Sequence, residues 1–176
     1  MAIKLKPSKG GFLRPFGCGE FIRDYLLGKM PYRAPAIDPS IGAPQADICR
    51  EYKLALIRER GMDRAVQLEE KLAKMQGRAI SPDEIDELFD RYFAQIPYKT
   101  TACRYHSFVV YFSMLIRLHW VVCTGMESPS DFQKHFPDGP SRKYYRITEA
   151  GRNTPDSAWR NPQKYERERL KPRSGT

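Results

Sequence analysis

The chain has few cysteines, and none of them stands in a metal-binding or redox motif. Its four cysteines are scattered without a CxxC pair, and no apolar signal core follows a positively charged start. Cys103 and His106 have a spacing that zinc could use, but no further ligands stand at a suitable spacing to complete a tetrahedral site. We therefore expect a cytoplasmic protein with free thiols and no metal site.

Long apolar runs are also missing. The longest one, residues 108–123, is too short to cross a bilayer, and it contains Arg117 and His119. Its composition predicts a core helix followed by a strand. We therefore expect no contact with a membrane.

The sequence lacks the motifs of the common catalytic classes. The glycines at residues 10–11 and 17–19 do not have the strand before them and the helix after them that a phosphate-binding loop requires. None of the three histidines has a convincing catalytic partner in the sequence. The acidic residues over 83–90 form a helix start that the helix dipole favours. The sequence predicts a protein that is not an enzyme and needs no cofactor.

Positive charge is in excess and gathers at the two ends of the chain. The formal net charge is +9, and residues 1–34 carry seven Lys and Arg against two acids. Residues 141–176 carry ten against four, whereas the 106 residues between carry thirteen against fifteen. Charge that is segregated in this way makes a directional field that attracts polyanions. Nucleic acid is the favoured partner, and basic tails on a subunit of a larger assembly are the alternative.

The length of 176 residues suits one domain with tails. Six prolines in residues 1–45 predict an irregular basic arm, with one short helix over 20–27 that Gly28 ends. Residues 153–176 mix charges with prolines, and we expect a basic tail that is ordered only on a partner. The folded domain is predicted over residues 46–152.

Two helices are predicted in the first part of this domain. Apolar residues at helical spacing indicate one over 46–60, which Gly61 ends. A second is predicted over 63–76, capped by Asp63. Its narrow apolar stripe suits either intramolecular packing or dimerisation and consists of Ala65, Leu68, Leu72 and Met75.

Two further helices follow. The third begins with a capping box of Ser81 and Glu84 and ends at Pro97. The fourth, over residues 101–119, has the widest apolar surface and is predicted to be the central helix. Its main stripe contains Tyr105, Phe108, Val109, Phe112, Leu115 and Ile116.

Two strands are predicted after the fourth helix. Residues 120–124 are β-branched and aromatic, and residues 142–147 form a second, basic strand. A Pro- and Gly-rich loop over 126–140 joins them. We expect Tyr145 and Ile147 to face inward in the second strand, or the opposite orientation for the aromatic pair.

A helix, a strand, a Pro- and Gly-rich loop and a second basic strand are the parts of a winged helix. Residues 115–122 and the run Arg-Lys-Tyr-Tyr-Arg-Ile-Thr-Glu-Ala-Gly-Arg at 142–152 resemble the end of winged-helix transcription regulators of the PadR and MarR type. The resemblance covers about residues 97–152. It implies a mostly α fold with a small β-hairpin, a winged helix-turn-helix-like domain. His119 stands where such proteins usually have a glycine.

The resemblance implies that the fourth helix presents its N-terminal turn to the major groove and that the wing touches phosphate or the minor groove. The implied contacts at the helix start are Lys99, Thr100, Thr101 and Arg104. The implied contacts on the wing are Arg142, Lys143 and Arg146. The alternatives are a helix cap with a surface charge for the first set and a solvated strand face for the second.

The sequence therefore predicts a nucleic-acid-binding protein, a winged-helix DNA-binding or transcription-regulatory protein. DNA is the favoured partner, and RNA is the alternative because charge does not separate the two. The alternative function is a structural or adaptor subunit of a larger protein or ribonucleoprotein complex. Its protein partners would bind residues 1–45 and 153–176. One question separates the functions, namely whether the start of the fourth helix is exposed beside the wing or covered by the first 45 residues.

Overall fold

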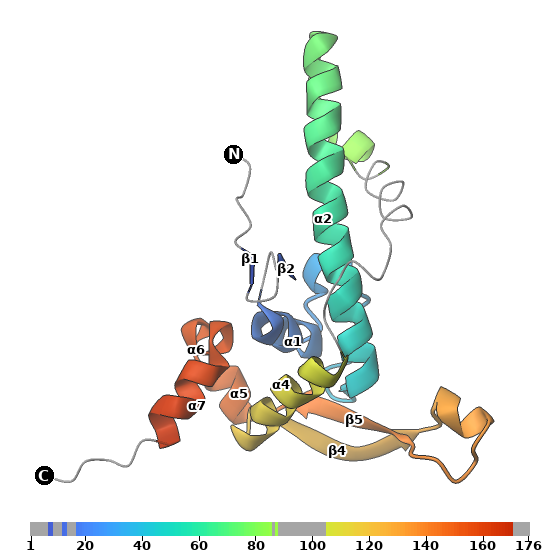
Figure 1. Ribbon diagram of the computed structural model, residues 1–176, viewed down its shortest axis with the longest axis vertical. Coiled ribbons are helices and arrows are strands. Elements are labelled where there is room, and N and C mark those ends of the chain that lie inside the picture. Colours follow the sequence, from blue (N-terminus) through green and yellow to red (C-terminus); the bar gives the residue numbers. More distant parts are fainter. Residues whose placement is uncertain (1–6, 9–11, 14–16, 86, 88–104, 171–176) are drawn as a thin grey trace, which may run out of the picture. The chain divides into compact units, whose positions relative to one another are not determined.

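The chain is mostly helical and contains a small three-stranded antiparallel sheet (Figure 1). This confirms the expected mostly α fold with a β-hairpin. It divides into two compact units, one of residues 1–15 and 53–102 and the other of residues 16–52 and 103–176. The computed structural model describes residues 7–8, 12–13, 17–85, 87 and 105–170.

The long helix α2, Gln45–Met75, starts in the second unit and continues into the first. It runs through Gly61, so the predicted helix end there and the new start at Asp63 are wrong. A glycine inside a helix costs only about 1 kcal/mol relative to alanine, which a long helix of good helix formers tolerates. Gly77, with φ of +69°, follows the end of α2, and Arg78 N–H donates to the Ala73 carbonyl at 3.0 Å.

The first unit also holds a short antiparallel pair of strands and the start of the third predicted helix. The strands are β1, Pro7–Ser8, and β2, Phe12–Leu13. The capping box is confirmed, because Ser81 N–H donates to Glu84 at 2.9 Å and Glu84 N–H donates to Ser81 Oγ at 3.2 Å. The predicted end of this helix at Pro97 lies outside the described residues.

The second unit carries the sheet, whose strand order is β3-β5-β4 with antiparallel pairing throughout. The strand β4 is longer than predicted, and it passes an irregular register between Cys123 and Glu127. The elements of this unit, in chain order, are α1 (Cys18–Leu26), η1 (Pro31–Arg33), β3 (Ala43–Pro44), the start of α2, α4 (Tyr105–Arg117), β4 (Val121–Ser128), η3 (Asp131–Lys134), β5 (Arg142–Ile147), α5 (Glu149–Asn153), α6 (Asp156–Arg160) and α7 (Pro162–Leu170).

A row of aromatic rings forms the core of the second unit and joins α1, α2, α4 and β5. Neighbouring ring centroids are 5.0–6.4 Å apart, which is the usual spacing of interacting aromatic pairs. Ile147 is buried and Tyr145 packs edge-on against Phe112, so the predicted inward orientation of these two β5 residues is confirmed. The row consists of Tyr25, Phe21, Tyr52, Phe108, Phe112 and Tyr145.

The N-terminal segment is more ordered than an irregular arm. The short helix predicted there is confirmed as α1, and Gly28 follows it with φ of +73°. Phe21, Ile22 and Leu26 of α1 are buried, and β3 pairs with β5. The description of residues 1–45 as an irregular arm is therefore wrong for β3, which pairs with β5, whereas the helix expected within the arm is present as α1.

The C-terminal segment is also folded as far as Leu170. Trp159 is 0% exposed, and its indole packs against Trp120 with ring centroids 4.7 Å apart. Tyr165 of α7 also packs against Trp120, with ring centroids 5.2 Å apart. The expectation that the tail is ordered only on a partner is wrong for this segment, because the tail supplies a buried tryptophan to the core.

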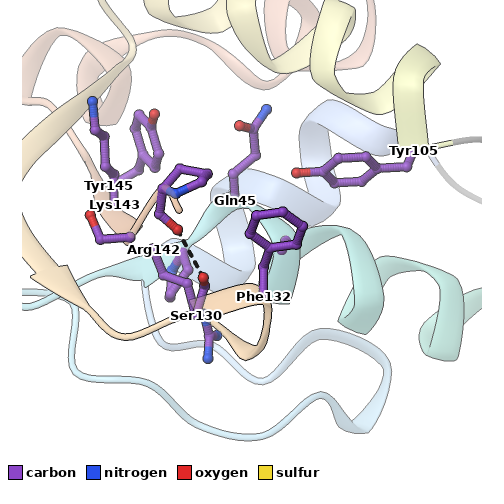
Figure 2. Close-up of a pocket in the computed structure, with 11 residues that line it drawn as sticks. Gln45, Tyr105, Ser130, Phe132, Arg142, Lys143 and Tyr145 are labelled. Atoms are coloured by element: carbon purple, nitrogen blue, oxygen red, sulfur yellow. Dashed lines mark hydrogen bonds between the residues drawn. The ribbon is translucent and has the colours of Figure 1, made fainter. Parts of the chain in front are cut away.

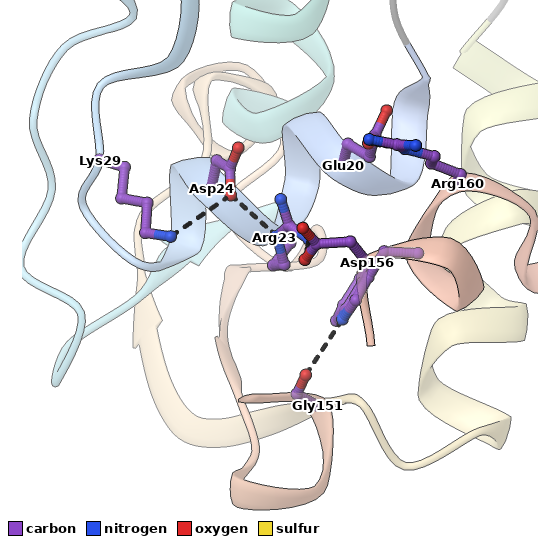
Figure 3. A network of polar contacts seen from close by, with 8 residues as sticks. Glu20, Arg23, Asp24, Lys29, Gly151, Asp156 and Arg160 are labelled. Carbon is purple, nitrogen blue, oxygen red and sulfur yellow. Dashed lines mark hydrogen bonds and ion pairs between the residues drawn. The ribbon is translucent and has the colours of Figure 1, made fainter. Parts of the chain in front are cut away.

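Ion pairs between α1 and α6 reinforce this packing (Figure 3). Arg23 of α1 donates to Asp156 of α6 at 2.6 Å, and Arg160 of α6 donates to Glu20 of α1 at 2.8 Å. Each helix thus offers one acid and one base to the other. Exposed pairs of this kind contribute little to stability, because water and salt screen them. They show that part of the positive charge at the two chain ends is neutralised by acidic residues of the same chain.

Candidate nucleic-acid interface

The β4–β5 hairpin forms a wing whose loop is held by its own hydrogen bonds. Ser130 caps η3 with a capping box, in which its Oγ accepts from Gln133 N–H and Gln133 Oε1 accepts from Ser130 N–H. Ser130 Oγ donates to the Pro140 carbonyl at 2.8 Å, and Gln133 Nε2 donates to the Gly139 carbonyl at 2.9 Å. These bonds tie the start of the loop to its end, so the wing has a defined shape.

Two phenylalanines project from this loop. Phe132 and Phe136 stack with ring centroids 4.7 Å apart, and both are exposed. A Cβ on Gly139 would lie 2.5 Å from the Phe132 ring, so this position requires a glycine for the ring to lie over the loop. The loop therefore presents an ordered aromatic surface to solvent.

The start of helix α4 is exposed beside the wing. Tyr105, His106 and Ser107 in its first turn are all exposed, and Tyr105 is 50% exposed. Residues of the N-terminal segment, such as Gln45, lie beside Tyr105 without covering it. The four predicted contacts that directly precede this turn lie outside the described residues, and they are Lys99, Thr100, Thr101 and Arg104.

Between the α4 start and the wing lies a pocket of about 370 Å³, which we call the wing pocket (Figure 2). Tyr105 and Phe132 lie at one side of it, Lys143 and Tyr145 lie at the other, and Gln45 stands between them. Three separate chain segments thus contribute to one concave surface. Its lining residues are Pro44, Gln45, Ala46, Tyr105, Ser130, Phe132, Pro140, Ser141, Arg142, Lys143 and Tyr145.

The three wing cations predicted as contacts have different environments. Arg142 is half-buried and forms an ion pair with Asp47 at the start of α2. It therefore fastens the hairpin to α2, and its charge is compensated within the fold. Lys143 is exposed, lines the wing pocket and forms no ion pair within the described residues.

Arg146 lies on the other face of the sheet from Lys143. The two residues are three positions apart in β5, and because successive side chains of a strand point to opposite faces, an odd separation places them on different faces. Arg146 lines a separate pocket of about 670 Å³ together with Val122, Thr148 and Arg152. The structure therefore does not bring Lys143 and Arg146 to one surface.

The segment that carries the resemblance, residues 142–152, has a clear structural role. Thr148 Oγ1 accepts from Gly151 N–H at 2.9 Å and donates to the His119 carbonyl at 2.5 Å, so it caps α5 and joins it to the end of α4. A Cβ on Gly151 would overlap the Trp120 carbonyl oxygen. Thr148 and Gly151 are therefore explained by packing, and within residues 142–152 only the basic side chains are candidates for binding a ligand.

Among the described residues that line the wing pocket, Lys143 is the cation without an ion pair. Lys134 on the loop is paired with Asp131 at 2.8 Å, and the hydrogen bond from Lys134 holds the pKa of Asp131 below its usual range. Burial raises the pKa of Tyr145 above its usual value. Lys143 thus supplies uncompensated positive charge beside neutral aromatic rings.

The described residues contain no group of three or more histidine, cysteine or acidic side chains placed to hold a metal ion. Cys103, the residue considered for zinc with His106, lies outside them. Among the described helices, none has both the length and the apolar character needed to cross a membrane. Comparisons with family models, with curated proteins and with solved structures find no match to this chain.

Of the residues that line the wing pocket, the sequence predicted only Arg142 and Lys143 as site residues, and three of those it missed are the most relevant to a ligand. Phe132 had a usable signal, because an aromatic residue in a Pro- and Gly-rich loop has little core nearby to enter. Tyr105 was assigned to the buried stripe of the fourth helix, but its place in the first turn leaves it exposed. Gln45 had no signal in the sequence, since only the fold brings the start of α2 to the wing.

Proposed function

We propose that this chain is a nucleic-acid-binding protein with a winged-helix-like domain and that DNA is its favoured partner. The observation that carries the proposal is the placement of the exposed α4 start beside the wing, where both line the wing pocket. The strand pair β4–β5 supplies the hairpin that the resemblance requires. A helix start and a wing on the same side are the two parts with which such domains engage a groove and the adjacent backbone.

The charge and polarity of this side support the same function. Lys143 offers an ammonium group to a phosphate, and Tyr105 and Ser107 offer hydroxyl groups. Lys99, Thr100, Thr101 and Arg104 precede Tyr105 directly in the chain, and we propose them as further contacts at the helix start. Arg142 and Arg146 are weaker candidates, because one is paired with Asp47 and the other faces away from the wing pocket.

A titration of the full chain with duplex DNA at several salt concentrations tests the function. We expect the logarithm of the binding constant to fall linearly with the logarithm of the salt concentration, because bound cations release counterions from phosphate. A mobility-shift or anisotropy assay measures the slope. Absence of binding at the lowest salt concentration would overturn the proposal.

A second candidate function is that of an adaptor subunit, and one observation favours it. Leu68, Leu72 and Met75 of α2 are 50%, 43% and 84% exposed and recur at helical spacing. An exposed apolar stripe of this kind is typical of a contact with another protein. Copurification of stable partners from the native source would support this function. The folded C-terminal segment weakens it, because Trp159 is already used within the chain.

A further inference from the structure

The wing pocket combines two exposed aromatic rings with polar groups that have no other strong partner. Tyr105 and Phe132 are 50% and 54% exposed and come from different elements, the start of α4 and η3. Both rings stand at the same side of the pocket (Figure 2). An aromatic face that stays open to water is a platform on which a planar ligand can stack.

The polar lining of the wing pocket narrows the choice of ligand. Ser130 Oγ already bonds to Pro140, and Arg142 is paired with Asp47. Among the described lining side chains, the half-buried amide of Gln45 and the ammonium of Lys143 have no hydrogen bond or ion pair and can meet a ligand. An amide can donate to and accept from the edge of a base, and an ammonium suits a phosphate.

We propose that the wing pocket binds a nucleobase that is unpaired and unstacked, with Tyr105 and Phe132 as the stacking platform and Lys143 on the attached phosphate. This inference rests on the proposed function and specifies the kind of nucleic acid. Paired bases within a duplex show only their edges in the grooves, so an aromatic face can be used only by a base that has left the stack. The pocket volume of about 370 Å³ lies near the lower end of the range of about 300–1,000 Å³ for small-ligand sites, which suits one nucleotide.

Three DNA probes that are based on one sequence test this inference with the full chain. They are a fully paired duplex, the same duplex with one extra unpaired thymidine, and the single strand. We expect the unpaired thymidine to strengthen binding about 10-fold over the paired duplex, which is within the range of one base–aromatic stack. A fluorescent purine at the unpaired position should be quenched on binding, because the base stacks on an aromatic ring.

Variants of the two rings make the test specific. Tyr105→Ala and Phe132→Ala should each weaken binding to the unpaired probe about 10-fold more than they weaken binding to the paired duplex. Tyr105→Leu should lose the preference as well, because it keeps apolar bulk without a ring, whereas Tyr105→Phe should retain it. Val110→Ala is the matched control, because Val110 is exposed on the same helix and does not line the pocket.

The outcomes separate the inference from the function on which it rests. Binding to the paired duplex without any preference for the unpaired probe would overturn the inference and leave the proposed function standing. Equal weakening of all probes by Tyr105→Ala and Phe132→Ala would also overturn it. Absence of binding to every probe at low salt would overturn both proposals.

Discussion

The indole nitrogen of Trp159 donates a hydrogen bond to the carbonyl oxygen of Gly151 at 3.0 Å, and both groups are buried. The bond joins α6 to α5, directly beyond the β4–β5 hairpin. Gly151 also lies against the backbone of Trp120, where no side chain fits. The C-terminal helices and the hairpin are therefore one packed structure, and the wing is attached to a rigid base.

Replacing Trp159 by phenylalanine should destabilise the second unit by about 1–2 kcal/mol, because the buried Gly151 carbonyl loses a donor while most of the ring volume remains. Urea unfolding followed by the fluorescence of Trp120, the other of the chain's two tryptophans, measures this loss. Tyr165→Phe is the control, since Tyr165 also contacts Trp120 but is partly exposed. An equally large loss in the control would contradict the role given to the Trp159 hydrogen bond.

His119 is the residue at which a glycine should stabilise the protein. It follows α4 with φ of +59°, and the next amide, Trp120 N–H, donates to the Leu115 carbonyl at 3.1 Å. A side chain is strained in this left-handed conformation, so His119→Gly should raise the free energy of unfolding by about 1 kcal/mol. Gly125→Ala, at φ of +81°, should lower it by a similar amount. Urea unfolding of both variants checks the opposite signs, and a loss of stability in His119→Gly would show that His119 is not strained.

Tyr25 should make the stability depend on pH in the alkaline range. Burial, followed in size by the nearby Glu51, raises the pKa of Tyr25 from 10.0 to about 12. The unfolded chain therefore loses this proton at a lower pH than the folded chain, and stability falls as the pH rises from about 10 towards 12. At about pH 11 the loss from this residue should be about 1 kcal/mol.

Tyr25→Phe tests this dependence, because it removes the ionisable group and keeps the ring, which is 5% exposed. The free energy of unfolding of the variant should decline less than that of the parent chain between neutral pH and about pH 11. Urea titrations at both pH values measure the two declines. Parallel declines in the two proteins would show that Tyr25 does not contribute.

The sequence was informative where a local pattern determines a local structure. The helix that starts at Ser81 follows from its capping box, and β5 follows from its β-branched and aromatic residues. Winged-helix regulators usually have a glycine where this chain has His119. The structure shows why a glycine suits this position, because His119 adopts a positive φ. In each case neighbours in the chain decide the conformation.

The sequence failed where distant segments decide the outcome. Gly61 was expected to end a helix, but α2 continues through it, and α2 is longer than either predicted helix. Trp159 looked like part of a tail, although it fills a space beside Trp120 that only the folded unit creates. The wing pocket could not be predicted for the same reason, because Gln45, Tyr105 and Phe132 are far apart in the chain.

The positions of Lys143 and Arg146 on opposite faces of β5 give the most direct test of the proposed function. Salt titrations with duplex DNA should be made for the parent chain, Lys143→Gln and Arg146→Gln. We expect the parent chain to bind at low salt, Lys143→Gln to reduce the magnitude of the salt slope by about one phosphate contact, and Arg146→Gln to reduce it less. Absence of binding by the parent chain, or a slope that changes only in Arg146→Gln, would contradict this expectation.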